Sequence, residues 1–195
     1  AEANLVRNPG FEEGMTGWSG SGNFAIDTEV ARGGAASLRL SNASEAENTQ
    51  VSQTITLNQE RPAPILVRAT SRAQDVSGVA DRDYSLYVDI YYTDGTPLYG
   101  RIFSFGCGTH DWEVGELVIE PEKPIRNVNV YLLLRRKSGT AWFDDVAVME
   151  DPRRVGNLAR EASVIVDSSY PDYDAEPIND GVLYPPADAH WTDEA

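Results

Sequence analysis

The sequence predicts an all-β protein in which two antiparallel sheets pack face to face. Apolar residues recur mainly at a spacing of two, and the apolar segments are short. Gly, Asn, Asp and Pro separate these segments, as expected for strands joined by turns. No sustained amphipathic helical pattern competes with this interpretation, because the loops are rich in residues that break helices.

The first half of the chain supplies several short strands. Each is an apolar segment bounded by turn-forming residues. These strands are expected at 24–30, 36–41, 50–57 and 65–71.

The clearest strand covers residues 84–92, where apolar and polar or aromatic residues alternate. One face is expected to carry Leu86, Val88 and Ile90, and the other Tyr87, Asp89 and Tyr91. Asp94-Gly95 follows, and this dipeptide tolerates the positive φ of a tight hairpin. The chain is therefore expected to return as a strand at 98–105.

The strand at 126–136 repeats this alternation. Val128, Val130, Leu132 and Leu134 share one face, and Asn127, Asn129, Tyr131, Leu133 and Arg135 share the other. Further strands are expected at 114–119 and 141–149. The total suits two packed sheets.

The charge balance argues against several classes of partner. The chain has 16 Lys and Arg residues against 31 Asp and Glu residues, a formal net charge of −15. This charge repels nucleic acid phosphates and anionic lipid surfaces, so we expect neither nucleic acid binding nor membrane insertion. The sequence also shows no long apolar run and no basic-then-apolar opening typical of a signal peptide.

The sequence does not signal a catalytic centre. Cys107 is the only cysteine, and the two histidines, His110 and His190, belong to no recognisable nucleophile, zinc or phosphate-binding motif. Carboxylates are abundant, but abundance alone does not define the pair that a glycosidase needs. We therefore expect a non-catalytic protein.

Two motifs at the ends of the predicted sandwich carry a resemblance to a known family. Residues 4–14 read Asn-Leu-Val-Arg-Asn-Pro-Gly-Phe-Glu-Glu-Gly and are followed by Trp18, and residues 140–148 read Thr-Ala-Trp-Phe-Asp-Asp-Val-Ala-Val. Together they resemble the first and last strands of carbohydrate-binding modules of the family 4, 9 and 22 type. The resemblance implies a galactose-binding-like jelly roll over residues 1–150 that binds sugar.

Carboxylates in the two motifs suggest a calcium site. Glu12 follows an Asn-Pro-Gly turn, and Asp144 and Asp145 lie in the last strand. Calcium prefers hard oxygen ligands, with carbonyls completing six to eight positions. The resemblance implies a structural Ca²⁺ held by Glu12 and one of the two aspartates, and strand alternation does not decide which. Glu29 is a further candidate ligand.

These carboxylates also have an interpretation that involves no metal. They could be solvated turn residues, or they could pair with Arg7 or Arg32.

The polar and aromatic faces of the central strands suggest a sugar site. A sugar needs an aromatic surface for its C–H face and residues such as Asp, Asn and Arg for its hydroxyls. In the family resembled, the concave sheet forms a cleft of this kind. The expected ligand-binding residues are Tyr87, Asp89, Tyr91, Arg101, Asn129, Tyr131 and Arg135.

Strand aromatics also occur simply because they form good cross-strand pairs, which is the alternative interpretation of this face. One irregularity concerns the strand at 98–105. Phe103 and Phe105 share the parity of Tyr99, which would make the supposed open face apolar. A bulge near Gly100 would shift the register, or a second domain could cover part of the sheet.

Residues 151–195 differ from the rest of the chain in their sequence pattern. After the polar joint Asp151-Pro152-Arg153-Arg154, the sequence resembles the start of a discoidin-like (factor V/VIII type C) domain. The stretch is too short for an independent domain, so we expect a truncated module or an extension that docks on the sandwich.

The expected function is non-catalytic carbohydrate binding, with carbohydrate and the neighbouring domains of the parent protein as partners. The parent would be a larger glycan-active enzyme, a glycoside hydrolase or lyase, that is secreted or held at the bacterial cell surface. The alternative is a structural or protein-interaction sandwich that positions neighbouring domains. A hydrolase or lyase would require a deep cleft with converging acid and base groups, which the sequence does not show.

Overall fold

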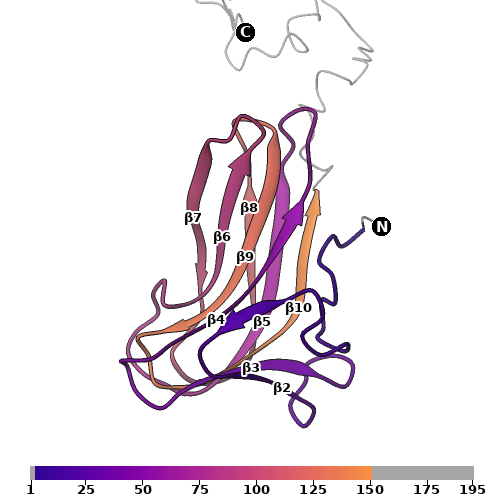
Figure 1. Cartoon of the computed structure of the whole chain (residues 1–195). Coiled ribbons are helices and arrows are strands. Elements are labelled where there is room, and N and C mark those ends of the chain that lie inside the picture. The colour runs from indigo at the N-terminus through magenta and orange to yellow at the C-terminus, as the bar shows by residue number, and fades with distance from the viewer. Residues whose placement is uncertain (1–2, 151–195) are drawn as a thin grey trace, which may run out of the picture. The chain divides into compact units, whose positions relative to one another are not determined.

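A computed structural model describes residues 3–150 as a sandwich of two five-stranded sheets (Figure 1). The strands are β1 (Ser19–Ser21), β2 (Phe24–Asp27), β3 (Ser37–Asn42), β4 (Asn48–Thr56), β5 (Ile65–Val76), β6 (Tyr84–Tyr92), β7 (Pro97–Ser104), β8 (Gly108–Ile119), β9 (Ile125–Arg135) and β10 (Gly139–Glu150). Sheet A has the order β1-β4-β9-β6-β7, and sheet B has the order β2-β3-β10-β5-β8. The predicted all-β sandwich is confirmed.

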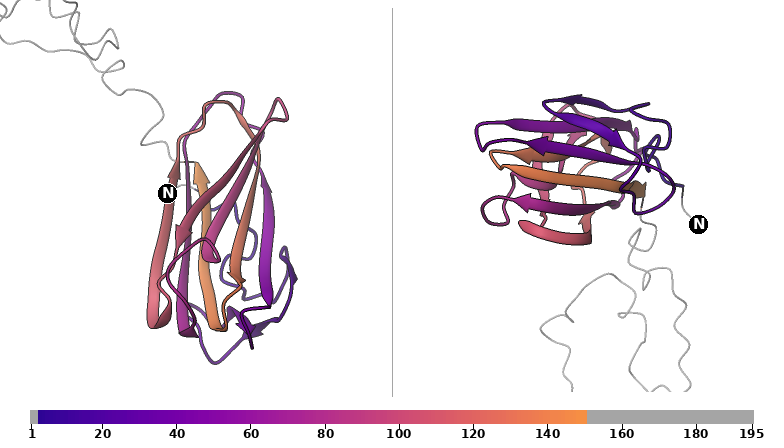
Figure 2. Two further views of the ribbon diagram at one scale, coloured as in Figure 1. Left: turned by 90° about the vertical axis from the view of Figure 1, so that its left-hand side faces the viewer. Right: turned by 90° about the horizontal axis from the view of Figure 1, so that it is seen from below.

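All strand pairs in both sheets are antiparallel. Figure 2 shows the two sheets as stacked layers. The predicted second region, 151–195, lies outside the described residues, and so does its resemblance to a discoidin-like domain. The described residues contain no helix of the length and apolar character needed to span a membrane.

The core lies between the two sheets and follows from the alternation in the central strands. In sheet A the fully buried side chains of β6 and β9 include Leu86, Val88, Ile90, Val128, Val130 and Leu132. Sheet B contributes fully buried residues such as Leu38, Leu40, Val67, Phe143 and Val148. Burying such side chains contributes roughly 1.5–3 kcal/mol each, so the alternation fixes which face of each strand points inward.

The N-terminal segment runs beside β10, although it is not itself a strand (Figure 1). The Leu5 amide donates to Val148 O at 2.9 Å, and the Val146 amide donates to Pro9 O at 3.0 Å. The Asn4 side chain donates to Val146 O and accepts from the Val148 amide. The two ends of the domain therefore lie together, as the paired motifs predicted, but β10 occupies the centre of sheet B.

Asn8 organises the loop that leads from this segment to β1. Its side chain donates to Gly14 O at 2.9 Å and Thr16 O at 3.2 Å, and it accepts from the Glu13 amide at 3.1 Å. Its carbonyl accepts from the Trp18 indole at 3.1 Å. Because these bonds close the loop on itself, the position of Glu12 is fixed.

Gly139, at the start of β10, should tolerate no side chain. Its φ is +111°, and a Cβ there would lie 2.5 Å from the Asp75 carbonyl oxygen. We expect Gly139→Ala to lower the free energy of unfolding by at least about 3 kcal/mol, because backbone must move. Gly95→Ala is the matched control, since Gly95 also has a positive φ but an added Cβ meets open space.

The control should cost only about 1 kcal/mol, the strain of a left-handed alanine. Urea unfolding of both variants measures the difference. Equal losses would contradict the close backbone approach at Gly139.

Candidate functional site

The outer face of sheet A gathers most of the predicted sugar-binding residues. The register pairs Tyr87 with Tyr131 and Asp89 with Asn129 across β6 and β9. Their strand neighbours Val88 and Val130 are buried in the core, so these four side chains point outward. Tyr91 and Tyr99 lie on the same face. We call this surface the tyrosine face: Tyr87, Asp89, Tyr91, Tyr99, Asn129 and Tyr131.

Two edge-to-face pairs of rings make up its aromatic surface. The Tyr87 and Tyr131 ring centroids are 5.8 Å apart, with an interplanar angle of 77°. Those of Tyr91 and Tyr99 are also 5.8 Å apart, at 79°, and their hydroxyls lie 3.2 Å from each other. Such geometry is favourable for tyrosine rings, so the pairs hold the rings in place. The cross-strand pairing that the alternative interpretation invoked is therefore present.

Asp89 lies among the tyrosines and shapes their electrostatics. Burial raises the pKa of Tyr87, and the charge of Asp89 and a hydrogen bond to it raise that pKa further. Burial also raises the pKa of Tyr131, with Asp89 again adding to the rise. The phenols consequently stay neutral and remain hydrogen-bond donors over a wide pH range.

Asn129 contributes an unused acceptor. Its Oδ1 atom is buried and has no hydrogen-bond partner among the described residues. A buried unsatisfied acceptor costs about 1–3 kcal/mol, which a donor from a ligand or a water molecule would relieve.

The structure corrects the prediction for Arg101. A bulge in β7 at Gly100, where φ is +73°, shifts the register, and the Gly100 amide donates to Asp89 at 2.9 Å. Arg101 then pairs with the core-facing Val88, so it does not share the tyrosine face. Beyond the bulge Phe103 pairs with Leu86 and packs against the core. The bulge that the parity conflict suggested is therefore present.

Arg135 lies on the outer side of sheet A, two residues beyond Leu133. It is the last residue of β9, and its Nη2 atom is 3.3 Å from Asp83 Oδ1. The sequence pattern did not indicate Arg82, which precedes β6 in a loop, yet its charge also acts on Tyr87. No strand periodicity covers a loop residue, so only its basic character could have drawn attention to it.

The acidic residues of the two end motifs meet around the 32–36 loop. Glu12 accepts from the Ala35 amide at 2.9 Å and the Ala36 amide at 3.2 Å. Asp144 is fully buried and accepts from the Arg32 amide at 2.9 Å and the Gly33 amide at 3.2 Å. Glu12 Oε1 and Asp144 Oδ1 both lie within 4 Å of the position that a Cβ on Gly10 would occupy. The fold thus brings these two carboxylates to one place.

The two remaining acidic candidates have different surroundings. Asp145 sits at the bulge of β10 with φ of +49° and forms an exposed ion pair with Arg32 at 2.6 Å. Pairing with Arg32 is the alternative to metal binding that the sequence analysis named. Glu29 is exposed, and its amide donates to Asp27. Within residues 3–150, no three acidic, His or Cys side chains cluster as a metal-binding group.

Substituting Asp89 should shift the titration of Tyr87. In Asp89→Asn the charge that favours the neutral phenol is gone, so the pKa of Tyr87 should fall toward its ordinary value, although burial still holds it above. Because the folded pKa is raised, the stability contributed by Tyr87 is complete below about pH 10 and is lost as pH rises further.

Ultraviolet titration of the phenols, with unfolding measured alongside, tests this expectation. The variant should ionise Tyr87 at lower pH and lose less stability in alkali than the wild type. Asp111→Asn, which removes an exposed carboxylate from β8 in the other sheet, should leave the titration unchanged. An identical titration of Asp89→Asn and the wild type would contradict the assigned role of Asp89.

Similar folds occur among solved carbohydrate-binding modules. The chain superimposes on a Family 16 Carbohydrate Binding Module-2 with a TM-score of 0.57 at 17% identity, covering 75% of this chain and 100% of that one. It also matches the CBM22-1 xylan-binding domain of Paenibacillus barcinonensis Xyn10C, with a TM-score of 0.56 at 17% identity and coverage of 77% and 96%. These likenesses show the fold.

The curated sequence relatives are much longer than this chain. The chain is 31% identical over 153 residues to the tRNA nuclease WapA of Bacillus subtilis (strain 168). It is 32% identical to the tRNA3(Ser)-specific nuclease WapA of Bacillus spizizenii. Each alignment covers 75% of this chain but 6% of the relative, so the chain spans a small part of the curated relatives it matches.

The family model described as a carbohydrate binding domain, of carbohydrate-binding module families 4 and 9, matches residues 3–135. The match covers more than half of the chain. The motif at residues 4–14 lies inside the match, the sandwich fold agrees with it, and the family is one of binding modules. The chain therefore belongs to the carbohydrate-binding module 4/9 family.

Proposed function

We propose that the tyrosine face of sheet A binds a glycan. The observation that carries the proposal is the combination, on one outward face, of paired aromatic rings with a carboxylate and an amide in the next row of the sheet. Sugar rings pack their C–H faces on aromatic side chains, and their hydroxyls bind carboxylate and amide oxygens. Tyr87 and Tyr131 would provide the packing surface, and Asp89 and Asn129 the polar contacts.

The site would bind without catalysis and serve a longer protein. Tethering a partner domain to a glycan raises its local concentration at the target without any new contact to it. We propose that the parent is secreted or held at the bacterial cell surface. A glycan-active parent enzyme would gain a higher local concentration at its substrate in this way. A nuclease like the relatives would gain too, because the module would hold the nuclease near a glycan-coated surface.

We also propose that a structural calcium ion joins Glu12 and Asp144. Burial raises the pKa of Asp144, and neither carboxylate has a salt-bridge partner within residues 3–150. Two acids that converge without a cation fit a cation-binding role, with nearby carbonyls completing the coordination. Asp145 and Glu29 would be accessory to it. Calcium would fix the N-terminal loop to β10 and take no part in chemistry.

Removing one aromatic ring should weaken glycan binding. We expect Tyr131→Ala to lower the affinity for any bound glycan about tenfold, because the ring's packing surface and its contact with Tyr87 are lost. A glycan array followed by calorimetry measures the change. Val118→Ala, at a 39% exposed position on β8 of the other sheet, should bind like the wild type.

Two outcomes would contradict the proposed glycan site. No binding to any glycan by the folded chain would refute the proposed function. Unchanged binding by Tyr131→Ala would place the site elsewhere.

Calcium should stabilise the wild type but not Glu12→Gln. At a calcium concentration 100 times Kd, a single site adds about 2.7 kcal/mol to the free energy of unfolding. The variant should lose this gain, because the neutral amide is a poor calcium ligand. Glu13→Gln removes an equal charge from the exposed neighbouring residue and should keep the full gain. Thermal unfolding of the wild type and both variants, with calcium and with chelator, measures this gain. A wild type whose melting temperature does not change with calcium would disprove the metal site.

A further inference from the structure

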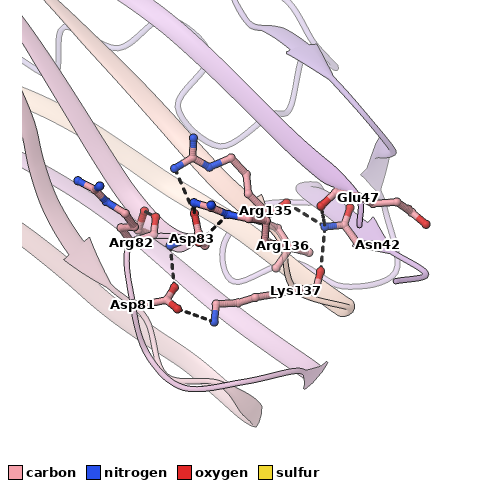
Figure 3. Close-up of polar contacts among 10 residues, drawn as sticks. Asn42, Glu47, Asp81, Arg82, Asp83, Arg135, Arg136 and Lys137 are labelled. Atoms are coloured by element: carbon pink, nitrogen blue, oxygen red, sulfur yellow. Dashed lines mark hydrogen bonds and ion pairs between the residues drawn. The ribbon is translucent and has the colours of Figure 1, made fainter. Parts of the chain in front are cut away.

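Basic residues cluster at one end of the tyrosine face. Four of them lie together where β9 ends and β6 begins: Arg82, Arg135, Arg136 and Lys137 (Figure 3). Two carboxylates, Asp81 and Asp83, lie among them. The Glu47 carboxylate, also in this region, accepts from the Ala43 amide. In a chain with a formal net charge of −15, this end of the face has a local excess of positive charge.

The ion pairs of the cluster show how far each cation is compensated. The buried Lys137 Nζ is 3.0 Å from Asp81 and donates to Val79 O at 2.8 Å. Arg136 binds Asp83 with two hydrogen bonds of 3.1 Å each. These two pairs use both carboxylates. Arg135 shares Asp83 at 3.3 Å, and Arg82, an exposed residue, has no salt bridge among the described residues.

Arg82, which has no salt bridge among the described residues, and Arg135, which shares Asp83 with Arg136, are the two cations whose charge acts on the tyrosine face. Arg82 and Arg135 both lower the pKa of Tyr87, opposing the effects of burial and of Asp89. Leu133 points to the outer side of sheet A and yet is only 2% exposed. Atoms of neighbouring residues therefore cover the outer side of β9 between Tyr131 and Arg135. The Nε atom of Arg135 is itself buried and has no hydrogen-bond partner within the part of the chain described.

We infer that the glycan bound by the tyrosine face is acidic, with its anionic group held by Arg82 and Arg135. This inference rests on the proposed function and specifies its substrate class. The face has opposite charges on its two sides, since Asp89 lies on one side of Tyr87 and the two arginines on the other. A neutral part of the glycan fits over Asp89 and its tyrosines, and an oxyanion fits the guanidinium groups.

The overall charge of the chain further limits which acidic polymers can bind to the tyrosine face. Densely charged polymers such as nucleic acids are repelled by the surrounding carboxylates. A glycan with separated acidic groups meets the two arginines without placing further charges against the acidic surface. A uronate carboxylate and a phosphate substituent share this chemistry, and matched ligands distinguish them.

The test compares each acidic glycan with its neutral counterpart. Pectin with a few free carboxylates is matched with its fully methyl-esterified form, glucuronoxylan with unsubstituted xylan, and a sparsely phosphorylated wall polysaccharide with its dephosphorylated form. The wild type should bind at least one acidic ligand about tenfold more tightly than its neutral match. Rising salt should weaken that binding, because screening reduces the attraction to exposed charges. The pair that shows the preference identifies the acid as carboxylate or phosphate.

Arg82→Gln is the decisive variant, because Arg82 has no salt bridge to lose and the sandwich should fold without it. The variant should lose most of the acidic preference and bind the neutral ligand as the wild type does. Arg61→Gln removes the same charge from the exposed β4–β5 loop and should keep the preference. Arg135→Gln should act like Arg82→Gln, with unfolding measured because its contact with Asp83 is lost.

The outcomes separate this inference from the proposed function. Equal affinity for acidic and neutral ligands, lost in Tyr131→Ala but not in Arg82→Gln, would overturn the acidic substrate and leave the glycan site intact. A preference that survives Arg82→Gln and Arg135→Gln would overturn the role of the arginines. Absence of all glycan binding would overturn both proposals.

Discussion

The register of β6 against β9 determines both the core and the candidate binding surface of sheet A. Side chains alternate along a strand, so each aliphatic residue that enters the core places its neighbour outside. Val88 and Val130 pair inside the sandwich, and their neighbours Tyr87 and Tyr131 pair outside it. A slip of one residue would put phenols and Asp89 into the core. The hydrophobic energy of the interior therefore holds the tyrosine face in its arrangement.

Bulges interrupt this regularity where both sheets carry candidate site residues. In β7 the bulge at Gly100 directs a backbone amide onto Asp89. In β10 the irregularity between Asp144 and Ala147 leaves Asp144 buried against the 32–36 loop and Asp145 exposed beside Arg32. Bulges reorient side chains without ending a strand, and both of these give an acidic residue a defined environment.

The sequence predicts what alternation and turn chemistry control. Every strand except the short β1, which was not predicted, follows from a spacing of two, as do the buried aliphatic residues of β6 and β9 and the outward position of Tyr87 and Tyr131. Arg101 could not be placed in this way, since parity fails beyond a bulge whose position depends on the partner strand. The parity conflict at Phe103 was the only sign of that failure. Arg82 was missed because it lies in a loop, where no periodicity constrains a side chain.

The two ends of the domain differ from the tyrosine face in what they contribute. Asn4 and Asn8 use their side chains to bind backbone groups of β10 and of their own loop, so their role is to build the sandwich. Glu12 and Asp144 converge as a result of that construction, in sheet B and its adjoining loops. The tyrosine face and its basic end belong to sheet A. A calcium ion between Glu12 and Asp144 would thus stabilise the scaffold. The charge pattern of the tyrosine face would select the glycan. Each of these two sites can be altered without the other.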